Sequence, residues 1–170
     1  MIRFCALAAA AGLAAFTGLD ALAADPLPTQ TNKVLTAALA VEAAQAAVAA
    51  CKAQGYNITV TVADRTGQTK VVIVGDGISV GSVGRESTRR KAYTSALRGI
   101  STEEFTKRIS GPGAFNPTVY DPQLATGAGG LPIKAGNETV GGISAAGAPG
   151  GDKDEACANA GIEKIKDRLN

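Results

Sequence analysis

The sequence predicts an α+β fold in which helices cover an antiparallel sheet. An alanine-rich helical segment comes first and is followed by a strand that alternates apolar and hydroxyl residues and by its hairpin partner. Further helices, a glycine-dense run of strands and a closing helix complete the chain. This order is expected when helices are layered on the faces of an antiparallel sheet.

The first predicted helix begins at Thr36, whose hydroxyl can cap it, and runs to Gln54. Gly55 then stops it, because glycine readily adopts the left-handed conformation that ends many helices. The high alanine content predicts that this helix packs closely against a neighbour.

A β-hairpin is predicted next, with strands over 58–62 and 70–74. In the turn, Asp64 can accept hydrogen bonds from backbone amides and Gly67 can take a positive φ. Because the second strand is apolar on both faces, we expect it to be a central strand of the sheet.

The rest of the chain alternates helical and extended patterns. Glu103 and Glu104 lie in the first turn of a short helix, where the helix dipole favours acidic residues. The predicted elements are helices over 80–98 and 102–109, an irregular loop over 110–122, strands around 123–126, 131–135 and 138–146, and a final helix over 152–168.

Residues 1–23 have the pattern of a secretory signal peptide. Arg3 supplies the positive charge, residues 7–16 form the apolar stretch, and Ala21-Leu22-Ala23 is a small-x-small cleavage site. A membrane anchor is the alternative, but the apolar stretch is shorter than the ~20 residues that a span needs. The sequence therefore predicts export to the periplasm or secretion.

The chain that remains after cleavage is of ordinary size for one domain. We expect a flexible polar lead over 24–33, a single domain over 34–170, and no second membrane-spanning stretch. The formal net charge of +2 is too small, and aromatic residues are too few, to indicate nucleic-acid binding.

Cys51 and Cys157 are the cysteines that remain once Cys5 leaves with the signal peptide. In an exported protein they can form a disulfide, which would close a loop of roughly a hundred residues. Two small buried thiols are the alternative. We favour the disulfide because the predicted compartment permits it.

Histidine is absent from the chain, and the one methionine is the initiator. Ser-His-Asp and Cys-His arrangements are therefore excluded, as are the usual histidine ligands of metals and haem. With no recognisable catalytic constellation, the sequence favours a binding protein over an enzyme.

The helix over 80–98 is the most polar of the predicted elements. It could form a cationic wall that pairs with the carboxylates of an anionic ligand. Alternatively it is a solvated face, with Glu86 and Arg90 forming a weak ion pair. Its two polar ridges consist of Arg85, Arg89 and Tyr93, and of Glu86, Arg90 and Thr94.

Two other groups of residues allow both a structural and a functional interpretation. Asp152, Asp154 and Glu155 stand where the last helix begins, so capping and the helix dipole explain them, although a metal or proton-transfer role is possible. Gly129 and Gly130 could cradle a ligand or could mark close packing.

Taken together, ordered motifs along residues 34–168 resemble the GlcG/HbpS-like haem-binding family, which includes the C-terminal domain of PduO-type corrinoid adenosyltransferases. The motifs are Val62-Ala63-Asp64 with Gly67, Asp76-Gly77, Lys91-Ala92-Tyr93-Thr94, Gly129-Gly130-Leu131-Pro132-Ile133, Val140-Gly141-Gly142-Ile143-Ser144 and Asp154-Glu155.

The resemblance implies a profilin-like α-β-α domain with a five-stranded antiparallel sheet, assembled into homo-oligomers. It also implies that an exported member binds or sequesters haem, and degradation of haem has been proposed for some members. The family's histidine ligation cannot apply here. Its acidic Glu-x-x-Glu iron site also fails, because Glu86 is followed by Arg89 and Arg90.

On this resemblance, haem would be held by arginine–propionate pairs, apolar contacts with the ring and an oxygen ligand such as Tyr93 or Thr94. A module for organic acids on the same scaffold and a haem-degrading enzyme are the alternatives. The candidate ligand-binding residues are Arg85, Glu86, Arg89, Arg90, Tyr93, Thr94, Gly129 and Gly130.

Overall fold

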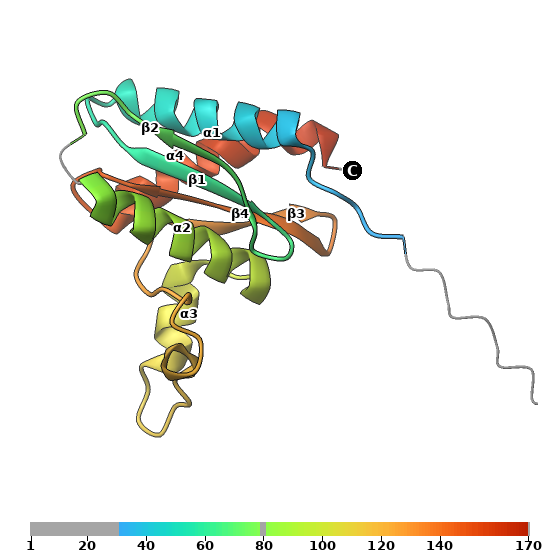
Figure 1. Cartoon of the computed structure of the whole chain (residues 1–170), viewed down its shortest axis with the longest axis vertical. Coiled ribbons are helices and arrows are strands. Elements are labelled where there is room, and N and C mark those ends of the chain that lie inside the picture. The colour runs from blue at the N-terminus through green and yellow to red at the C-terminus, as the bar shows by residue number, and fades with distance from the viewer. Residues whose placement is uncertain (1–30, 79–80, 170) are drawn as a thin grey trace, which may run out of the picture. The chain divides into compact units, whose positions relative to one another are not determined.

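The computed structural model describes residues 31–78 and 81–169 (Figure 1). The predicted signal peptide and most of the predicted lead lie outside the described residues. The elements are α1 (Ala37–Lys52), β1 (Thr59–Asp64), β2 (Thr69–Val74), α2 (Gly81–Arg98), α3 (Thr102–Ile109), β3 (Gly130–Ala135), β4 (Glu138–Ala146) and α4 (Gly151–Ile165), with short 3-10 turns at Pro117–Val119 and Lys166–Arg168.

The strands form one antiparallel sheet in the order β2-β1-β4-β3. Helices α1 and α4 pack together on one face, and α2 covers the other (Figure 1). Helix α3 and the loop after it extend beyond α2, away from the sheet. No helix within 31–78 and 81–169 is long and apolar enough to cross a membrane.

Strand β2 lies at an edge of the sheet, so the prediction that it is central is wrong. Its inner side chains, Val71 and Ile73, pack against the core under α1. Its other face is not covered by α2, which leaves Val72 and Val74 exposed by 42% and 46%. An apolar pattern on both faces did not distinguish this half-covered edge strand from a buried central one.

The sheet has four strands, so the expectation of five is wrong. The segment 123–126, predicted as a strand, is irregular because helical side chains bind its backbone. Arg90 donates to the carbonyl of Leu124 at 2.7 Å, and the amide of Ala125 donates to the Thr94 hydroxyl at 2.8 Å. These groups are unavailable for a strand ladder. The profilin-like assignment stays a prediction.

The apolar core lies between the sheet and the α1/α4 layer. Val60, Val62 and Ile143 project from the sheet toward small residues of the two helices, and all three are fully buried. The predicted disulfide is confirmed: Cys51 of α1 is bonded to Cys157 of α4, with their Cα atoms 5.5 Å apart. The alanine-rich first helix therefore packs against the last one, as its composition predicts.

The predicted cap of the first helix and the hairpin turn are also confirmed, while the helix ends at Lys52, two residues before the predicted Gln54. The Thr36 hydroxyl accepts from the amide of Leu39, and Gly55 has a φ of +82°. In the hairpin turn, the Asp64 carboxylate accepts from two backbone amides, and Gly67 also has a φ of +82°.

Hydrogen bonds between small side chains hold α2 against the sheet. The Thr61 and Thr88 hydroxyls are 2.8 Å apart, and the Ser144 hydroxyl donates to the carbonyl of Thr88 at 2.6 Å. A Cβ at Gly142 would lie 2.3 Å from the carbonyl oxygen of Ala92, so only glycine allows this approach. The small inner ridge of the helix permits this close contact.

Candidate ligand-binding site

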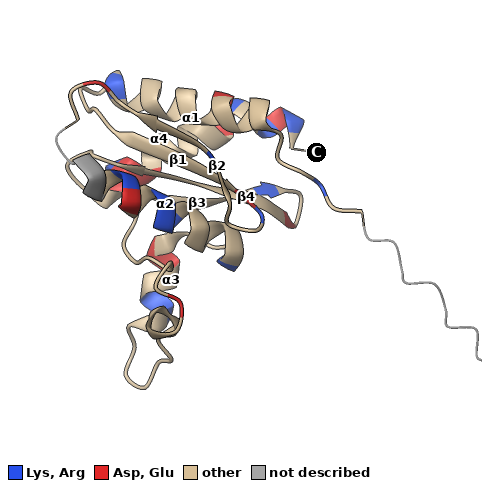
Figure 2. Ribbon diagram, viewed as in Figure 1, with Lys and Arg blue, Asp and Glu red and all other residues tan. Residues whose placement is uncertain are grey.

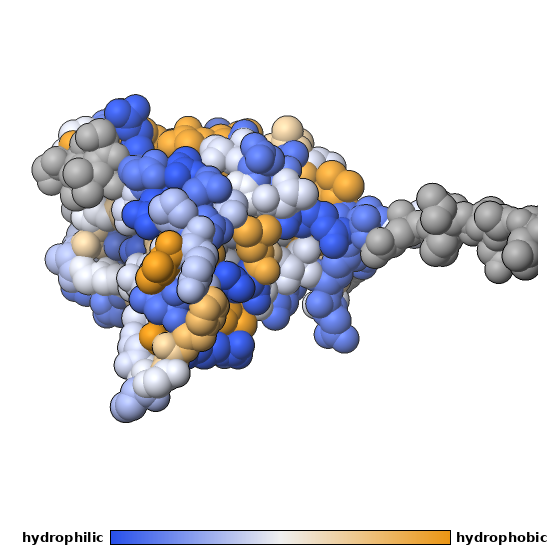
Figure 3. All heavy atoms as spheres, turned by 60° about the horizontal axis from the view of Figure 1, so that its bottom comes forward, coloured by the Kyte–Doolittle hydropathy of each residue, from blue (hydrophilic) through white to orange (hydrophobic). Residues whose placement is uncertain are grey.

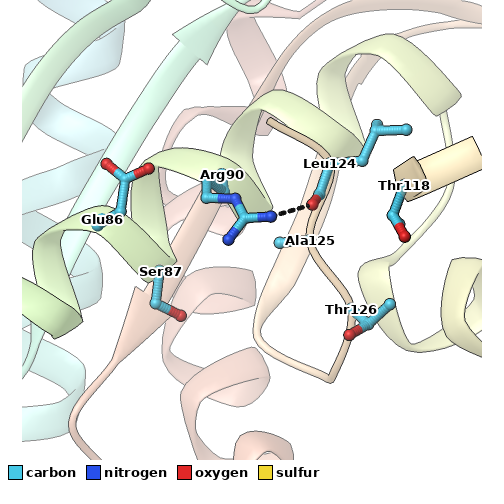
Figure 4. Close-up of a pocket in the computed structure, with 7 residues that line it drawn as sticks. All are labelled: Glu86, Ser87, Arg90, Thr118, Leu124, Ala125 and Thr126. Carbon is cyan, nitrogen blue, oxygen red and sulfur yellow. Dashed lines mark hydrogen bonds between the residues drawn. The ribbon is translucent and has the colours of Figure 1, made fainter. Parts of the chain in front are cut away.

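An open groove of about 580 Å³ lies between the first half of α2 and the loop that follows the 3-10 turn at Pro117–Val119 (Figure 4). Three of its residues come from α2, one from the 3-10 turn and three from the loop. The lining residues are Glu86, Ser87, Arg90, Thr118, Leu124, Ala125 and Thr126.

Arg90 is the cation of this groove. Its Nη2 donates to the carbonyl of Leu124 at 2.7 Å, and its Nε is buried without a hydrogen-bond partner. Its other terminal nitrogen makes no bond to the residues drawn in Figure 4. Among the described residues no carboxylate forms an ion pair with Arg90. Arg90 therefore presents to the groove a positive charge that is in no ion pair with an acidic side chain of the described residues.

Glu86 is paired with Arg89, so the predicted Glu86–Arg90 pair is wrong. The Arg89 Nη2 and Nε donate to the two carboxylate oxygens at 2.7 and 2.9 Å. This fork geometry satisfies both oxygens, and the hydrogen bond from Arg89 lowers the pKa of Glu86. Figure 2 shows these opposite charges side by side along the first half of α2. Because Arg89 neutralises Glu86, the charge of Arg90 stays available.

The two predicted oxygen ligands are engaged inside the protein and do not line the groove. The Tyr93 hydroxyl donates to Asp121 at 2.9 Å, and partial burial together with this bond raises the pKa of Tyr93. The Thr94 hydroxyl is buried, donates to the carbonyl of Arg90 and accepts from the amide of Ala125. These side chains support the wall of the groove.

The remaining predicted site residues lie elsewhere. Arg85 is exposed and has no side-chain partner among the described residues. Gly129 and Gly130 are buried where β3 begins, beside α2. A Cβ at Gly130 would lie 2.7 Å from the methyl group of Thr102. Close packing accounts for this pair of glycines.

Lys91 and Asp154 flank Gly129, a pairing that sequence reasoning missed. A Cβ at Gly129 would lie 3.3 Å from the Lys91 Nζ and 3.3 Å from the Asp154 Cβ. Burial lowers the pKa of Lys91 and raises that of Asp154. The Asp154 carboxylate accepts from the amide of Ala148 at 2.9 Å, so it binds the preceding loop rather than capping α4. Among the described residues no cluster of three or more acidic or cysteine side chains could hold a metal.

No local pattern in the sequence indicated the loop side of the groove. Thr118, Leu124 and Thr126 are separated from Arg90 by about thirty residues, and their approach depends on long-range contacts. Leu124 is nearly fully buried and anchors the loop, while its carbonyl accepts from Arg90.

These features define a small α+β domain with a cationic groove beside one helix. The family model described as "Haem degrading protein HbpS-like" matches residues 35–163. The chain belongs to the HbpS-like family.

Solved structures agree with this assignment. A Streptomyces reticuli HbpS double mutant, in which two glutamates are changed to aspartates, is 38% identical, with a TM-score of 0.71. The alignment covers 92% of this chain and 97% of that one. A second structure of HbpS is 40% identical over 84% of this chain and 97% of that one, with a TM-score of 0.72. No curated protein matches.

More distant structures share the fold. The Klebsiella pneumoniae protein ORFY is 19% identical over 83% of this chain and 98% of that one, with a TM-score of 0.73. A PduOC:Heme complex is 20% identical over 78% of this chain and 96% of that one, with a TM-score of 0.69.

Proposed function

We propose that this protein binds haem or a related tetrapyrrole in the groove beside α2, with Arg90 holding a propionate. The observation that carries the proposal is the Arg90 guanidinium, which lines the groove without a carboxylate partner among the described residues. Membership of the HbpS-like family and the haem named with a distant structural neighbour support the ligand class.

The side chains of the groove fit the parts of such a ligand. Arginine pairs well with carboxylates, because its planar fork can donate two hydrogen bonds. Ala125 offers apolar contact to the ring, and the hydroxyl oxygens of Ser87 and Thr126 line the groove. They take the place of Tyr93 and Thr94, whose hydroxyls are engaged.

Titration of the purified protein with haem, followed by absorbance, tests this proposal. We expect a saturable shift of the Soret band. Arg90→Gln should weaken binding about tenfold or more, since hydrogen bonds to charged groups contribute roughly 1.5–3 kcal/mol. Arg90→Lys should retain part of the affinity because it keeps the charge.

Lys134→Gln is the matched control, because this exposed cation of β3 lies outside the groove. It should bind haem as tightly as the unchanged protein. Absence of saturable uptake, or equal affinity in Arg90→Gln and the unchanged protein, would contradict the proposal.

Degradation of haem is a second candidate, favoured by the description of the family. Haem can supply its own reactivity with a reductant and oxygen, so the absence of histidine is compatible with it. Loss of the Soret band over minutes with a reductant in air, faster than for free haem, would indicate degradation. A stable spectrum would indicate binding alone.

A small organic acid is the alternative ligand for the same cation. A thermal-shift series with citrate and with haem separates the two, because a ligand that binds only the folded protein raises its melting temperature. Stabilisation by citrate without uptake of haem would favour the organic acid.

We further infer that the protein is exported and self-associates. The signal-peptide pattern of residues 1–23 and the disulfide support an oxidising compartment. The exposed valines of the edge strand β2, Val72 and Val74, support self-association, because an exposed apolar edge strand can contact a second copy of the chain. N-terminal sequencing of the periplasmic or secreted protein and its size in light scattering test these two inferences.

A further inference from the structure

A second groove, of about 560 Å³, lies between the end of α2, helix α3 and the loop that follows α3. None of its lining residues belongs to the groove beside α2. Figure 3 shows apolar patches among charged side chains on the face that carries α3. The apolar residues that line the groove include Leu97, Ile100, Phe105, Ile109, Phe115 and Pro117.

The walls of this groove consist of one buried aromatic ring and several exposed apolar side chains. Phe105 is 4% exposed and is anchored in α3, whereas Leu97 and Phe115 are 44% and 69% exposed. Phe115 stacks on Tyr120, with ring centroids 5.6 Å apart. A concavity of this size that is lined largely by apolar and aromatic side chains is typical of small-molecule sites.

Two arginines line the groove, and they differ in their partners. Arg108 forms an ion pair with Glu104 one turn earlier. Arg98 has no carboxylate partner among the described residues, and its guanidinium carbon lies 5.6 Å from the centroid of the Phe105 ring. The groove thus places one uncompensated cation against an aromatic surface.

We propose that this groove binds an aromatic monocarboxylate, with its ring against Leu97 and Phe115 and its carboxylate at Arg98. A ring suits the aromatic walls, because aromatic pairs in offset or edge-to-face contact gain energy beyond the area they bury. A carboxylate suits Arg98, because an ion pair beside an apolar wall is less weakened by water than one in open solvent. The site is independent of the tetrapyrrole groove, since the two share no residues.

Fluorescence titration with 2-naphthoate tests this proposal in the purified protein. We expect saturable binding of one molecule per chain. Arg98→Gln should weaken it about tenfold, and Phe115→Ala about fivefold. Neither change should alter folding, because both side chains are exposed. The uncharged 2-naphthamide should bind about tenfold more weakly than 2-naphthoate.

Matched controls separate the proposed contacts from general charge and hydrophobicity. Arg108→Gln removes a cation that is already paired, and Val119→Ala removes an apolar side chain that is 74% exposed and lies outside the groove. Each should change the affinity for 2-naphthoate less than threefold.

Absence of saturable binding, equal affinity for the amide, or equal losses in Arg98→Gln and Arg108→Gln would overturn this proposal. Arg90→Gln distinguishes it from the proposed function. That variant should lose affinity for haem and keep its affinity for 2-naphthoate, and loss of both ligands in Arg90→Gln would also overturn the separate site.

Discussion

On the α1/α4 face of the sheet, Val60, Val62 and Ile143 pack against alanines, whereas on the α2 face Thr61 and Ser144 form hydrogen bonds with Thr88. The first face gains stability from apolar burial, which is non-directional. The second depends on hydrogen bonds and on close backbone approach, both of which need one geometry.

This difference has a consequence for the candidate site. Thr88 is bonded to the sheet only two residues before Arg90, so the register of α2 is fixed where the groove begins. We infer that the polar face positions the outer side chains of α2, while the apolar face, with its disulfide, supplies most of the stability.

Removing the disulfide, which joins the two helices of the apolar face, should have the largest effect. Cys51→Ala with Cys157→Ala should lower the free energy of unfolding by ~4–5 kcal/mol in the chain-entropy view. Urea unfolding measures this change. Reductant should destabilise the unchanged protein and leave the double variant unaffected. A double variant as stable as the oxidised protein would contradict the assignment of stability to this face.

Adding one methyl group at Gly142 tests whether the α2 face of the sheet needs the close approach of the helix. Gly142→Ala should cost about 3 kcal/mol, because its Cβ would meet backbone atoms of Ala92 and Ala96 at 2.3 and 2.8 Å. Gly111→Ala is the control, since its Cβ would meet only the Ala114 Cβ at 4.0 Å. Equal stabilities of the two variants in urea would show that α2 does not need this close approach.

Two threonines of β1 test how much the hydrogen bonds of the polar face contribute. Both side chains lie on the α2 face, but only the Thr61 hydroxyl has a hydrogen-bond partner. Thr61→Val removes the partner of Thr88 and should cost about 1–2 kcal/mol. The hydroxyl of Thr59 is buried without a partner, so Thr59→Val should be neutral or stabilising. Thermal unfolding of the pair measures the difference, and a larger loss in Thr59→Val would contradict the hydrogen-bond explanation.

The smallest effect concerns Asp154, which lies on the other side of Gly129 from Lys91, just before β3 begins. Burial raises the pKa of Asp154, so the folded protein binds this proton more tightly than the unfolded chain. Its contribution to stability therefore increases as the pH falls from the raised pKa to the ordinary carboxyl value.

Asp154→Asn removes this proton-binding group. The stability of the unchanged protein relative to Asp154→Asn should thus rise on acidification, as measured by urea unfolding between pH 7 and pH 4. The difference between the proteins cancels the opposite contributions of Glu42, Asp64 and Glu86, whose pKa values are lowered. A difference that falls on acidification would contradict the sign of the shift.

Local signals predicted much of the fold. Capping by Thr36, the hairpin turn at Asp64 and the order of helices and strands all follow from residues close together in the sequence. The place of β2 in the sheet and the backbone of segment 123–126 do not, because each depends on a distant helix: α2 leaves the outer face of β2 open and binds the backbone of 123–126.

Only the helical part of the candidate site was predicted, because its residues are close together in the sequence. Helical spacing brought out Glu86, Arg89 and Arg90, and two of them line the groove. Spacing alone could not decide which arginine pairs with Glu86, since residues three and four apart are both neighbours on a helix. The loop partners Thr118 and Thr126 could not be found without the tertiary structure.

The Cys51–Cys157 bond joins the first helix to the last and makes the polypeptide between them a covalent ring. The exposed loop around Gly113 and Asn116 lies within that ring. A protease that cuts there would yield two pieces that stay linked, migrating as one band until a thiol reagent separates them. The disulfide therefore keeps a nicked molecule in one covalent piece.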